Sequence, residues 1–112
     1  MAIGHAVPAR GDVYLVQLDP TRGSEIRKTR PCVVVSPDEL NEHLRTVIVA
    51  PMTTGGQGYP WRVACRFQGR SGFVVTDQLR TVNTERLAKR LGRLSSNSLA
   101  TVLSTLEEMF AP

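Results

Sequence analysis

The stretch "PCVVVSPDELNEHLRTVIVAPM", residues 31–52, holds two apolar β-branched segments on either side of a short polar one. Residues 31–36 and 45–52 have the composition of strands. Ser-Pro at 36–37 predicts that a helical turn begins between them. If the two strands are antiparallel, the start of the first lies beside the end of the second. The residues around Pro31 and just beyond Met52 would then meet at one edge of a sheet.

Further short strands are expected on both sides of this stretch. Residues 12–20, 61–67 and 73–82 alternate or are rich in β-branched side chains, and turn sequences containing Gly, Pro and Asp separate them. We expect 73–82 to form another strand, which could be long and bent. Residues 85–95 fit either a short helix followed by a strand or a single helix.

The C-terminal segment predicts an amphipathic helix that begins after a cap at Ser95 or Ser96. Its apolar residues recur at the spacing of one helix face: Leu99, Val102, Leu103, Leu106, Met109 and Phe110. Five or more short strands followed by one helix predict a mainly β fold with α: a small, strongly curved antiparallel barrel of SH3-like size, with a short internal helical turn and a C-terminal α-helix. We expect residues 1–112 to form one domain.

Composition is that of a folded globular protein, with 41% hydrophobic and 21% charged residues. We expect a cytoplasmic location, because no apolar run approaches the roughly 20 residues of a membrane span and no signal peptide is recognisable. Cys32 and Cys65 are then expected to be buried free thiols. The net charge is +4, with 12 Arg and 2 Lys. Arginine binds phosphate bidentately, so either nucleic acid or an acidic protein is an expected partner, with solvated surface charge as the alternative.

Motifs for metal, nucleotide or histidine chemistry are missing from the sequence. The two histidines, His5 and His43, stand in unrelated contexts, and there is no CxxC, HxxxH, P-loop or GxGxxG pattern. The aspartates are scattered. An enzyme with this sequence is expected to work without a metal, a cofactor or a catalytic histidine.

One constellation remains, at the predicted sheet edge. Proline restrains the residue before it to extended geometry, so Pro31 should fix the direction of Arg30 at the strand entrance. Thr53 and Thr54 follow the neighbouring strand and supply hydroxyl donors. A guanidinium and a hydroxyl on one rim would suit a phosphodiester. The alternatives are an ion pair between Arg30 and Glu25, and ordinary turn hydroxyls at both threonines.

Four blocks of the sequence resemble the MazF/PemK toxins of bacterial toxin–antitoxin systems. They are "RGDVYLVQLDPTRGSE", "TRPCVVVSPDELN", "VIVAPMTTGGQGYPW" and "FVVTDQLRTV", in that order, and they run from about Arg10 to Val82. The resemblance implies an SH3-like (MazF/CcdB-like) barrel and a homodimer. It also implies a metal-independent mRNA interferase, a sequence-specific endoribonuclease that cleaves single-stranded RNA through its own 2′-hydroxyl. A MazE-type antitoxin with an acidic tail would neutralise it.

Carried over by motif, the family's catalytic arginine falls on Arg30 and its catalytic hydroxyl on Thr53, with a supporting glutamate at Glu25. Some relatives have a histidine directly before Arg-Pro, where this chain has Thr29. Further residues are expected to bind RNA: Arg22, Arg27, Lys28, Thr54, Gln78 and Arg80.

Two points stay open at this stage. Tyr59 or Trp61 could stack on a base, although Trp61 is expected in the core because it is in register with Val63 and Cys65. The alternative functions are a gyrase-directed (CcdB-like) toxin on the same fold and a non-catalytic RNA- or protein-binding module.

Overall fold

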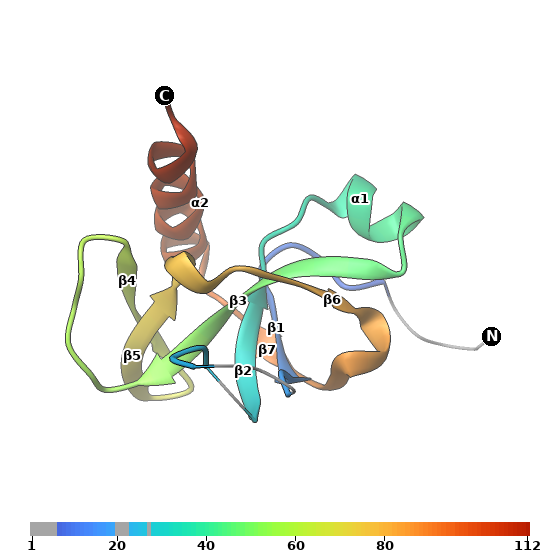
Figure 1. The fold of residues 1–112 in the computed structure, drawn as a ribbon, viewed down its shortest axis with the longest axis horizontal. Helices are drawn as coiled ribbons and strands as arrows, with labels where there is room; N and C mark the ends of the chain where they lie inside the picture. Colours follow the sequence, from blue (N-terminus) through green and yellow to red (C-terminus); the bar gives the residue numbers. More distant parts are fainter. Residues whose placement is uncertain (1–6, 20–22, 27) are drawn as a thin grey trace.

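The computed structural model describes residues 7–19, 23–26 and 28–112 (Figure 1). In this part of the chain seven strands and two α-helices alternate with two short 3₁₀ turns. The strands are β1 (Asp12–Gln17), β2 (Thr29–Val34), β3 (Thr46–Thr54), β4 (Arg62–Phe67), β5 (Arg70–Val75), β6 (Arg80–Asn83) and β7 (Leu87–Arg93). The helices are α1 (Asp38–His43) and α2 (Ser96–Phe110), and the 3₁₀ turns are η1 (Thr76–Gln78) and η2 (Thr84–Arg86).

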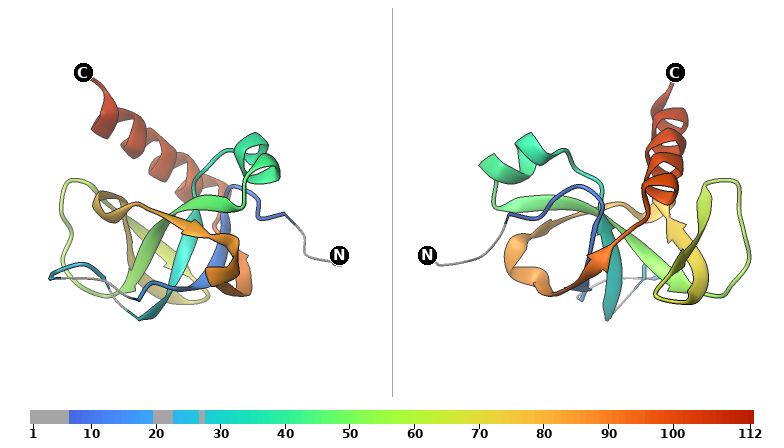
Figure 2. Two further views of the ribbon diagram at one scale, coloured as in Figure 1. Left: turned by 45° about the vertical axis from the view of Figure 1, so that its right-hand side comes forward. Right: turned by 180° about the vertical axis from the view of Figure 1, so that it is seen from behind.

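The strands form one antiparallel sheet in the order β4-β5-β3-β2-β1-β7, with β6 added along the first half of β3. The sheet curls as a small barrel does, although β4 and β7 remain at opposite ends of the order and do not pair. Helix α2 leaves the curled sheet, and its C-terminal end projects away from it (Figure 2). The mainly β fold with a short internal helix and a C-terminal helix confirms the expectation from the sequence.

Strand β3 is the centre of this arrangement because it pairs with three other strands. One edge of β3 holds β2, through Cys32↔Pro51 and the two following pairs. The other edge pairs first with β6 and then, from Met52 to Thr54, with β5. At the second junction Gly72 lies so close to β3 that a Cβ there would be 1.7 Å from the Thr53 carbonyl oxygen. Only glycine fits this crossing.

The alternation of side chains in the central strands builds two apolar clusters, one on each face of the sheet. The first cluster includes Val33, Ala50 and Met52 of the sheet, and Val102 of α2 packs with them. The second cluster consists of Val16, Leu18, Cys32, Val34, Val47, Val49 and Val82. Burying each such valine contributes about 1.5–3 kcal/mol. The near-continuous apolar runs predicted as strands therefore reflect burial on both faces.

Three expectations for individual segments need correction or completion. Residues 73–82 form no single strand, because η1 separates β5 from β6 and lets the chain turn from the second half of β3 to the first. Residues 85–95 adopt the first of the two alternatives, with η2 followed by β7. Helix α2 is capped by Ser95, whose hydroxyl accepts a hydrogen bond from the Ser98 amide at 3.2 Å.

Trp61 is not in the core, and that expectation is wrong. Its side chain is 40% exposed, whereas Val63 is buried. The alternation that places Val63 inwards starts only at Arg62, because Trp61 belongs to the turn before β4. Cys32 is a buried free thiol, as expected, and Cys65 is a free thiol that is half-buried. Among the described residues, no helix is long and apolar enough to cross a membrane.

Gly72→Ala is expected to destabilise the protein strongly. The new methyl group would overlap the Thr53 carbonyl, so β3 and β5 must separate or shift, at a cost of about 1–3 kcal/mol or more. Urea unfolding followed by circular dichroism measures this loss. Gly58→Ala is the matched control, because a Cβ there meets the Phe73 ring at an ordinary 3.4 Å. Equal stability of the two variants would contradict the assigned crossing.

Candidate active site

The register of β2 against β3 brings the start of one strand to the end of the other. Cys32 pairs with Pro51, and each step forward along β2 is a step back along β3. The same register, continued two residues past this pair, sets Arg30 opposite Thr53. The antiparallel arrangement expected from the sequence is therefore confirmed, and it places the two residues at one rim of the sheet.

Arg30 and Thr53 also share a face of the sheet. Arg30 pairs with Val16 and stands two residues before Cys32, and both of these belong to the second apolar cluster. Thr53 stands two residues after Pro51, the partner of Cys32. Because side chains two residues apart on a strand point to the same face, Arg30 and Thr53 both lie on the face of the second apolar cluster. The Arg30 guanidinium and the Thr53 hydroxyl thus lie on neighbouring strands and on the same face of the sheet.

The Arg30 side chain is available to a ligand. The residue is exposed at the strand entrance. Thr53 is half-buried and Thr54 is exposed. A cavity of about 420 Å³ adjoins both strands, but its lining includes Met52, Cys65 and Phe67 of the first apolar cluster and does not include Arg30. The exposure of Arg30 itself leaves the rim open to a molecule from solution.

The segment between β1 and β2 crosses the same face and is closed at its base. The Leu18 amide donates to the Lys28 carbonyl at 2.9 Å, and the Lys28 amide donates to Asp19 Oδ1 at 3.1 Å. Arg86 Nη1 donates to the carbonyl oxygens of Gln17 at 3.1 Å and Asp19 at 2.6 Å. Lys28 itself has a φ of 65°, a conformation that non-glycine residues rarely adopt. These contacts hold an unfavourable backbone conformation two residues before Arg30.

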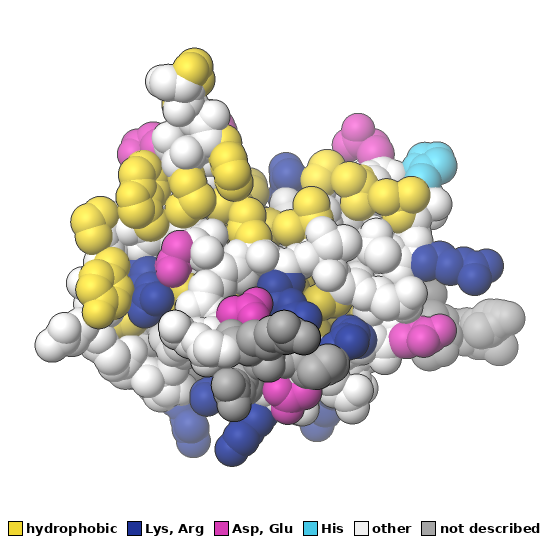
Figure 3. Space-filling view, viewed as in Figure 1, with side chains coloured by type: hydrophobic (Ala, Val, Ile, Leu, Met, Phe, Trp, Pro, Cys, Tyr) yellow, Lys and Arg dark blue, Asp and Glu magenta, His cyan; other side chains and the backbone are white. Residues whose placement is uncertain are grey.

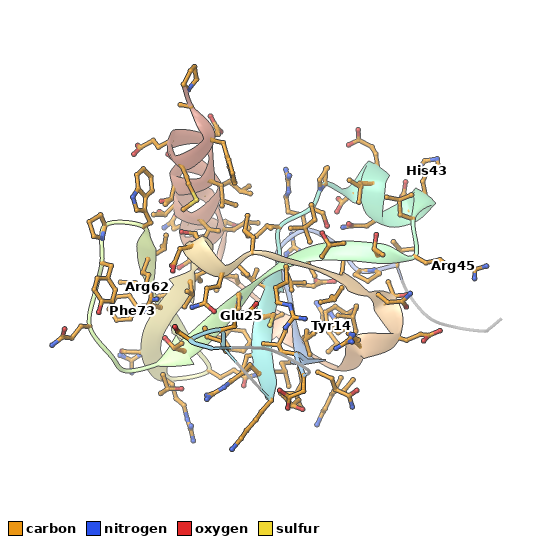
Figure 4. The ribbon with its side chains drawn as sticks, in the orientation of Figure 1. Tyr14, Glu25, His43, Arg45, Arg62 and Phe73 are labelled. Atoms are coloured by element: carbon orange, nitrogen blue, oxygen red, sulfur yellow. The ribbon has the colours of Figure 1, made fainter. Side chains whose placement is uncertain are left out.

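Gln78 and Arg80, two of the expected RNA-binding residues, contact this segment. Gln78 Oε1 accepts from the Ile26 amide at 2.8 Å, next to Glu25. Arg80 Nη1 donates to the Leu18 carbonyl at 2.5 Å. Figure 4 shows Glu25 at the middle of the face, where this segment passes in front of the sheet. Exposed Lys28 follows Glu25 three residues further along the chain, whereas Arg22 and Arg27 lie outside the described residues.

The two cysteine thiols near the rim are held in their neutral form. Burial raises the pKa of the Cys32 thiol to about 12, and the nearby positive charge of Arg80 only partly opposes this. Burial likewise raises the pKa of Cys65. Neither thiol is therefore a nucleophile at neutral pH. Among the described residues, no three His, Cys, Asp or Glu side chains gather as a metal site.

The histidines stand apart from this rim as far as they are described. His43 is exposed on α1, and its Nδ1 lies 2.6 Å from the Glu39 carbonyl. Figure 4 shows His43 and Arg45 at the end of the molecule away from Arg62 and Phe73, with Glu25 between. His5 lies outside the described residues.

Sequence reasoning missed Asp19 and Arg86, which close the segment before Arg30. Arg86 reaches carbonyl groups 67 and 69 residues away in the chain. Such side-chain contacts to backbone leave no periodic or spacing signal. Asp19 did carry a signal as part of a turn sequence, Asp-Pro, but its carboxylate accepts the amide of Lys28, nine residues further along the chain, which a turn signal does not indicate.

The curled antiparallel sheet with a C-terminal helix is shared with a class of bacterial toxins. Residues 9–110 match the family model described as the PemK-like, MazF-like toxin of type II toxin–antitoxin systems. The chain belongs to this family. The resemblance stated from the sequence motifs is thereby confirmed.

Curated relatives are named endoribonucleases. The endoribonuclease toxin MazF of Escherichia coli K12 is 38% identical over 80 residues, which cover 71% of this chain and 72% of that protein. The endoribonuclease MazF9 of Mycobacterium tuberculosis is 36% identical over 102 residues, covering 81% and 86%.

Solved structures share the fold over nearly the whole chain. MazF of Deinococcus radiodurans superposes with a TM-score of 0.82 at 29% identity, covering 94% of this chain and 97% of that one. A MazE–MazF structure from the same organism superposes with a TM-score of 0.77 at 26% identity, covering 96% and 98%.

Asp19→Ala is expected to loosen the segment before Arg30 without unfolding the sheet. Loss of one acceptor worth about 1 kcal/mol should speed hydrogen exchange of the Lys28 amide by about 5-fold. Hydrogen exchange followed by NMR measures it. Asp19→Asn keeps an acceptor oxygen and is the control. Unchanged exchange at Lys28 in the alanine variant would show that this contact does not hold the turn.

Proposed function

We propose that this chain is an endoribonuclease toxin that cuts single-stranded RNA at specific sequences, without a metal, in the cytoplasm. The observation that carries the proposal is the register of β2 against β3, which sets Arg30 opposite Thr53 on one face of the sheet. The family and the endoribonuclease names of its relatives support the reaction class.

In the proposed reaction the RNA supplies its own nucleophile. The 2′-oxygen attacks the adjacent phosphorus as it loses its proton, and the bond to the 5′-oxygen of the next nucleotide breaks. The products are a 2′,3′-cyclic phosphate and a 5′-hydroxyl that takes up a proton. Because the attacking group is already tethered beside phosphorus, positioning supplies much of the rate.

The residues at the rim are proposed to stabilise the negative charge that develops on the oxygens around phosphorus. Arg30 can donate two parallel hydrogen bonds to the phosphate oxygens, and its direction is set by Pro31. Thr53 donates a third bond from the neighbouring strand. Fixed donors of this kind stabilise the transition state more than the ground state. Arg30 is assigned electrostatic stabilisation, since a guanidinium holds its proton too tightly to act as an efficient general acid at neutral pH.

Glu25 is the proposed base for the 2′-hydroxyl, because it lies where the segment crosses the face of the sheet (Figure 4), whereas the Asp19 carboxylate of the same segment accepts the Lys28 amide. Lys28 and Thr54 are proposed to bind the neighbouring phosphates, as are Arg22 and Arg27 in the same segment. Gln78 and Arg80 combine that proposed role with the contacts that hold the segment in place.

A MazE-type antitoxin and a second copy of the chain are the proposed protein partners. A structure of MazF with MazE shares this fold over 96% of the chain. The net charge of +4 suits an acidic antitoxin segment. Figure 3 shows Lys and Arg side chains at the centre and lower edge of one face, and a band of hydrophobic side chains over α2 and beyond it. The hydrophobic band is the surface proposed for the second copy.

Arg30→Ala and Thr53→Val are expected to slow cleavage of RNA at least about 100- to 1,000-fold, the usual loss for one donor to a developing oxyanion. The assay incubates purified protein with long single-stranded RNA in EDTA and follows the initial rate. Arg45→Ala is the matched control: it removes an equal charge at the far end of the molecule, and its rate should be unchanged (Figure 4). Thr53→Ser keeps the hydroxyl and should retain most activity.

A second substrate tests the nucleophile. RNA with 2′-deoxyribose at the mapped cut site should be bound and left intact. Cutting of this substrate would exclude attack by the 2′-hydroxyl, and full activity of Arg30→Ala would place the catalytic centre elsewhere. If wild-type protein cuts no RNA and instead inhibits gyrase, the alternative toxin class holds.

A further inference from the structure

The loop between β3 and β4 presents two aromatic side chains that the proposed reaction does not use. Tyr59 is 57% exposed and Trp61 is 40% exposed. Isolated exposed rings are unremarkable on soluble proteins, but rings fixed beside cations are the usual platforms for unstacked bases of single-stranded RNA. The surroundings of Tyr59 therefore decide whether it is such a platform.

Tyr59 is backed by a cation that is itself held in place. The Arg62 Cζ atom lies 4.7 Å from the centroid of the Tyr59 ring, within the range of a cation–π contact. The Arg62 guanidinium donates to both carboxylate oxygens of Asp77, from Nε at 3.2 Å and from Nη2 at 3.3 Å. One face of the ring is thus covered by a fixed arginine. Tyr59 is nevertheless 57% exposed, so part of its side chain remains open to a ligand.

The backbone that carries Tyr59 is also fixed. The Arg62 amide donates to the Tyr59 carbonyl at 2.9 Å, which closes a tight turn. The Thr76 hydroxyl donates to the Trp61 carbonyl. On the other side of Tyr59, Gly58 lies against the Phe73 ring. A ligand that stacks on Tyr59 would have little loop or side-chain freedom to freeze, which favours binding.

The platform lies on the face that carries Thr53. Thr53 pairs with Phe73 of β5, and Phe73 pairs with Ala64 of β4, so the three residues form a row across the sheet. Neighbouring strands are about 4.8 Å apart, so the row spans roughly 10 Å. Figure 4 shows Arg62 and Phe73 near each other, beside the loop between β3 and β4.

An open groove of about 550 Å³ borders this row. Its lining includes Gly55, Gly56, Arg66 and Phe73. Because Arg62 and Arg66 alternate with buried Val63, they stand on the same side of β4 as Ala64. The groove therefore offers the Arg66 cation to a phosphate backbone, and Arg62 stands two residues before it on the same side of β4. Two cations on this side favour nucleic acid over an uncharged apolar partner.

We infer that the open face of Tyr59 stacks on one nucleobase of the RNA near the cut phosphate. This inference rests on the proposed endoribonuclease function. Stacking of this kind tolerates any base, because every base has a π face, so Tyr59 contributes affinity and register and leaves base identity to other contacts.

The first test measures binding of a short RNA that spans a mapped cut site and carries 2′-deoxyribose there. Tyr59→Leu should weaken binding about 5- to 150-fold, the value of one stacked base. Tyr59→Phe keeps the ring and should bind within about 2-fold of wild type. Leu44→Ala is the matched control, because it removes a similarly exposed apolar side chain, 51% exposed, at the end of α1.

The second test locates the stacked base. A series of the same RNA, each with one base replaced by an abasic site, should show one position where wild type loses affinity and Tyr59→Leu loses none further. Such coupling cannot come from a general loss of folding.

The outcomes separate the two proposals. If wild type cuts RNA and Tyr59→Leu binds every substrate of the series as wild type does, the stacking inference fails and the endoribonuclease stands. If wild type neither binds nor cuts RNA, the proposed function fails and this inference fails with it. If Tyr59→Leu weakens binding of every abasic RNA to the same extent, the inference also fails, because Tyr59 would then have a structural role.

Discussion

The pairing of Cys32 with Pro51 is the constraint on which the rest of the structure depends. It fixes which residues of β2 and β3 meet, and a slip of one position would turn Arg30 to the opposite face from Thr53. Such a slip would also move each side chain of β2 from one apolar cluster into the other, where it would no longer match its neighbours. The packing that stabilises the fold therefore also specifies the geometry of the candidate site.

Around this register, the remaining contacts restrict the segments that border the rim. Arg86, Gln78 and Arg80 hold the segment that precedes Arg30, each through a backbone group. On the other side, Gly72 allows β5 to approach Thr53 closely. In both places the sheet supplies rigid support and the connecting segments supply the exposed groups, a division typical of binding sites built on small β folds.

Much of the fold could be predicted from the sequence because its strongest signals are local. The valine runs that became β2 and β3, the Ser-Pro before α1 and the apolar spacing of α2 each follow from burial or capping. The expected strand at 73–82 failed because the η1 turn is dictated by the change of partner along β3, which is a long-range property. The prediction that Trp61 lies in the core failed because the alternating pattern was applied to one residue before the strand begins.

The candidate site divides in the same way. Pro31 indicated from the sequence that Arg30 stands at the strand entrance, and the family motifs indicated Thr53 and Glu25. The supports of the site, such as Arg86 and Asp77, came only from the coordinates, since they act through contacts between residues far apart in the chain. A sequence can therefore indicate the reactive side chains, whereas the hydrogen bonds that orient them depend on the complete fold.

The most direct test of the central claim is a crystal structure of the protein with an RNA made uncleavable by 2′-deoxyribose at the cut site. The account predicts that oxygens of the cut-site phosphate lie about 2.7–3.2 Å from both the Arg30 guanidinium and the Thr53 hydroxyl. A phosphate bound at another surface, with Arg30 and Thr53 both facing solvent, would contradict it.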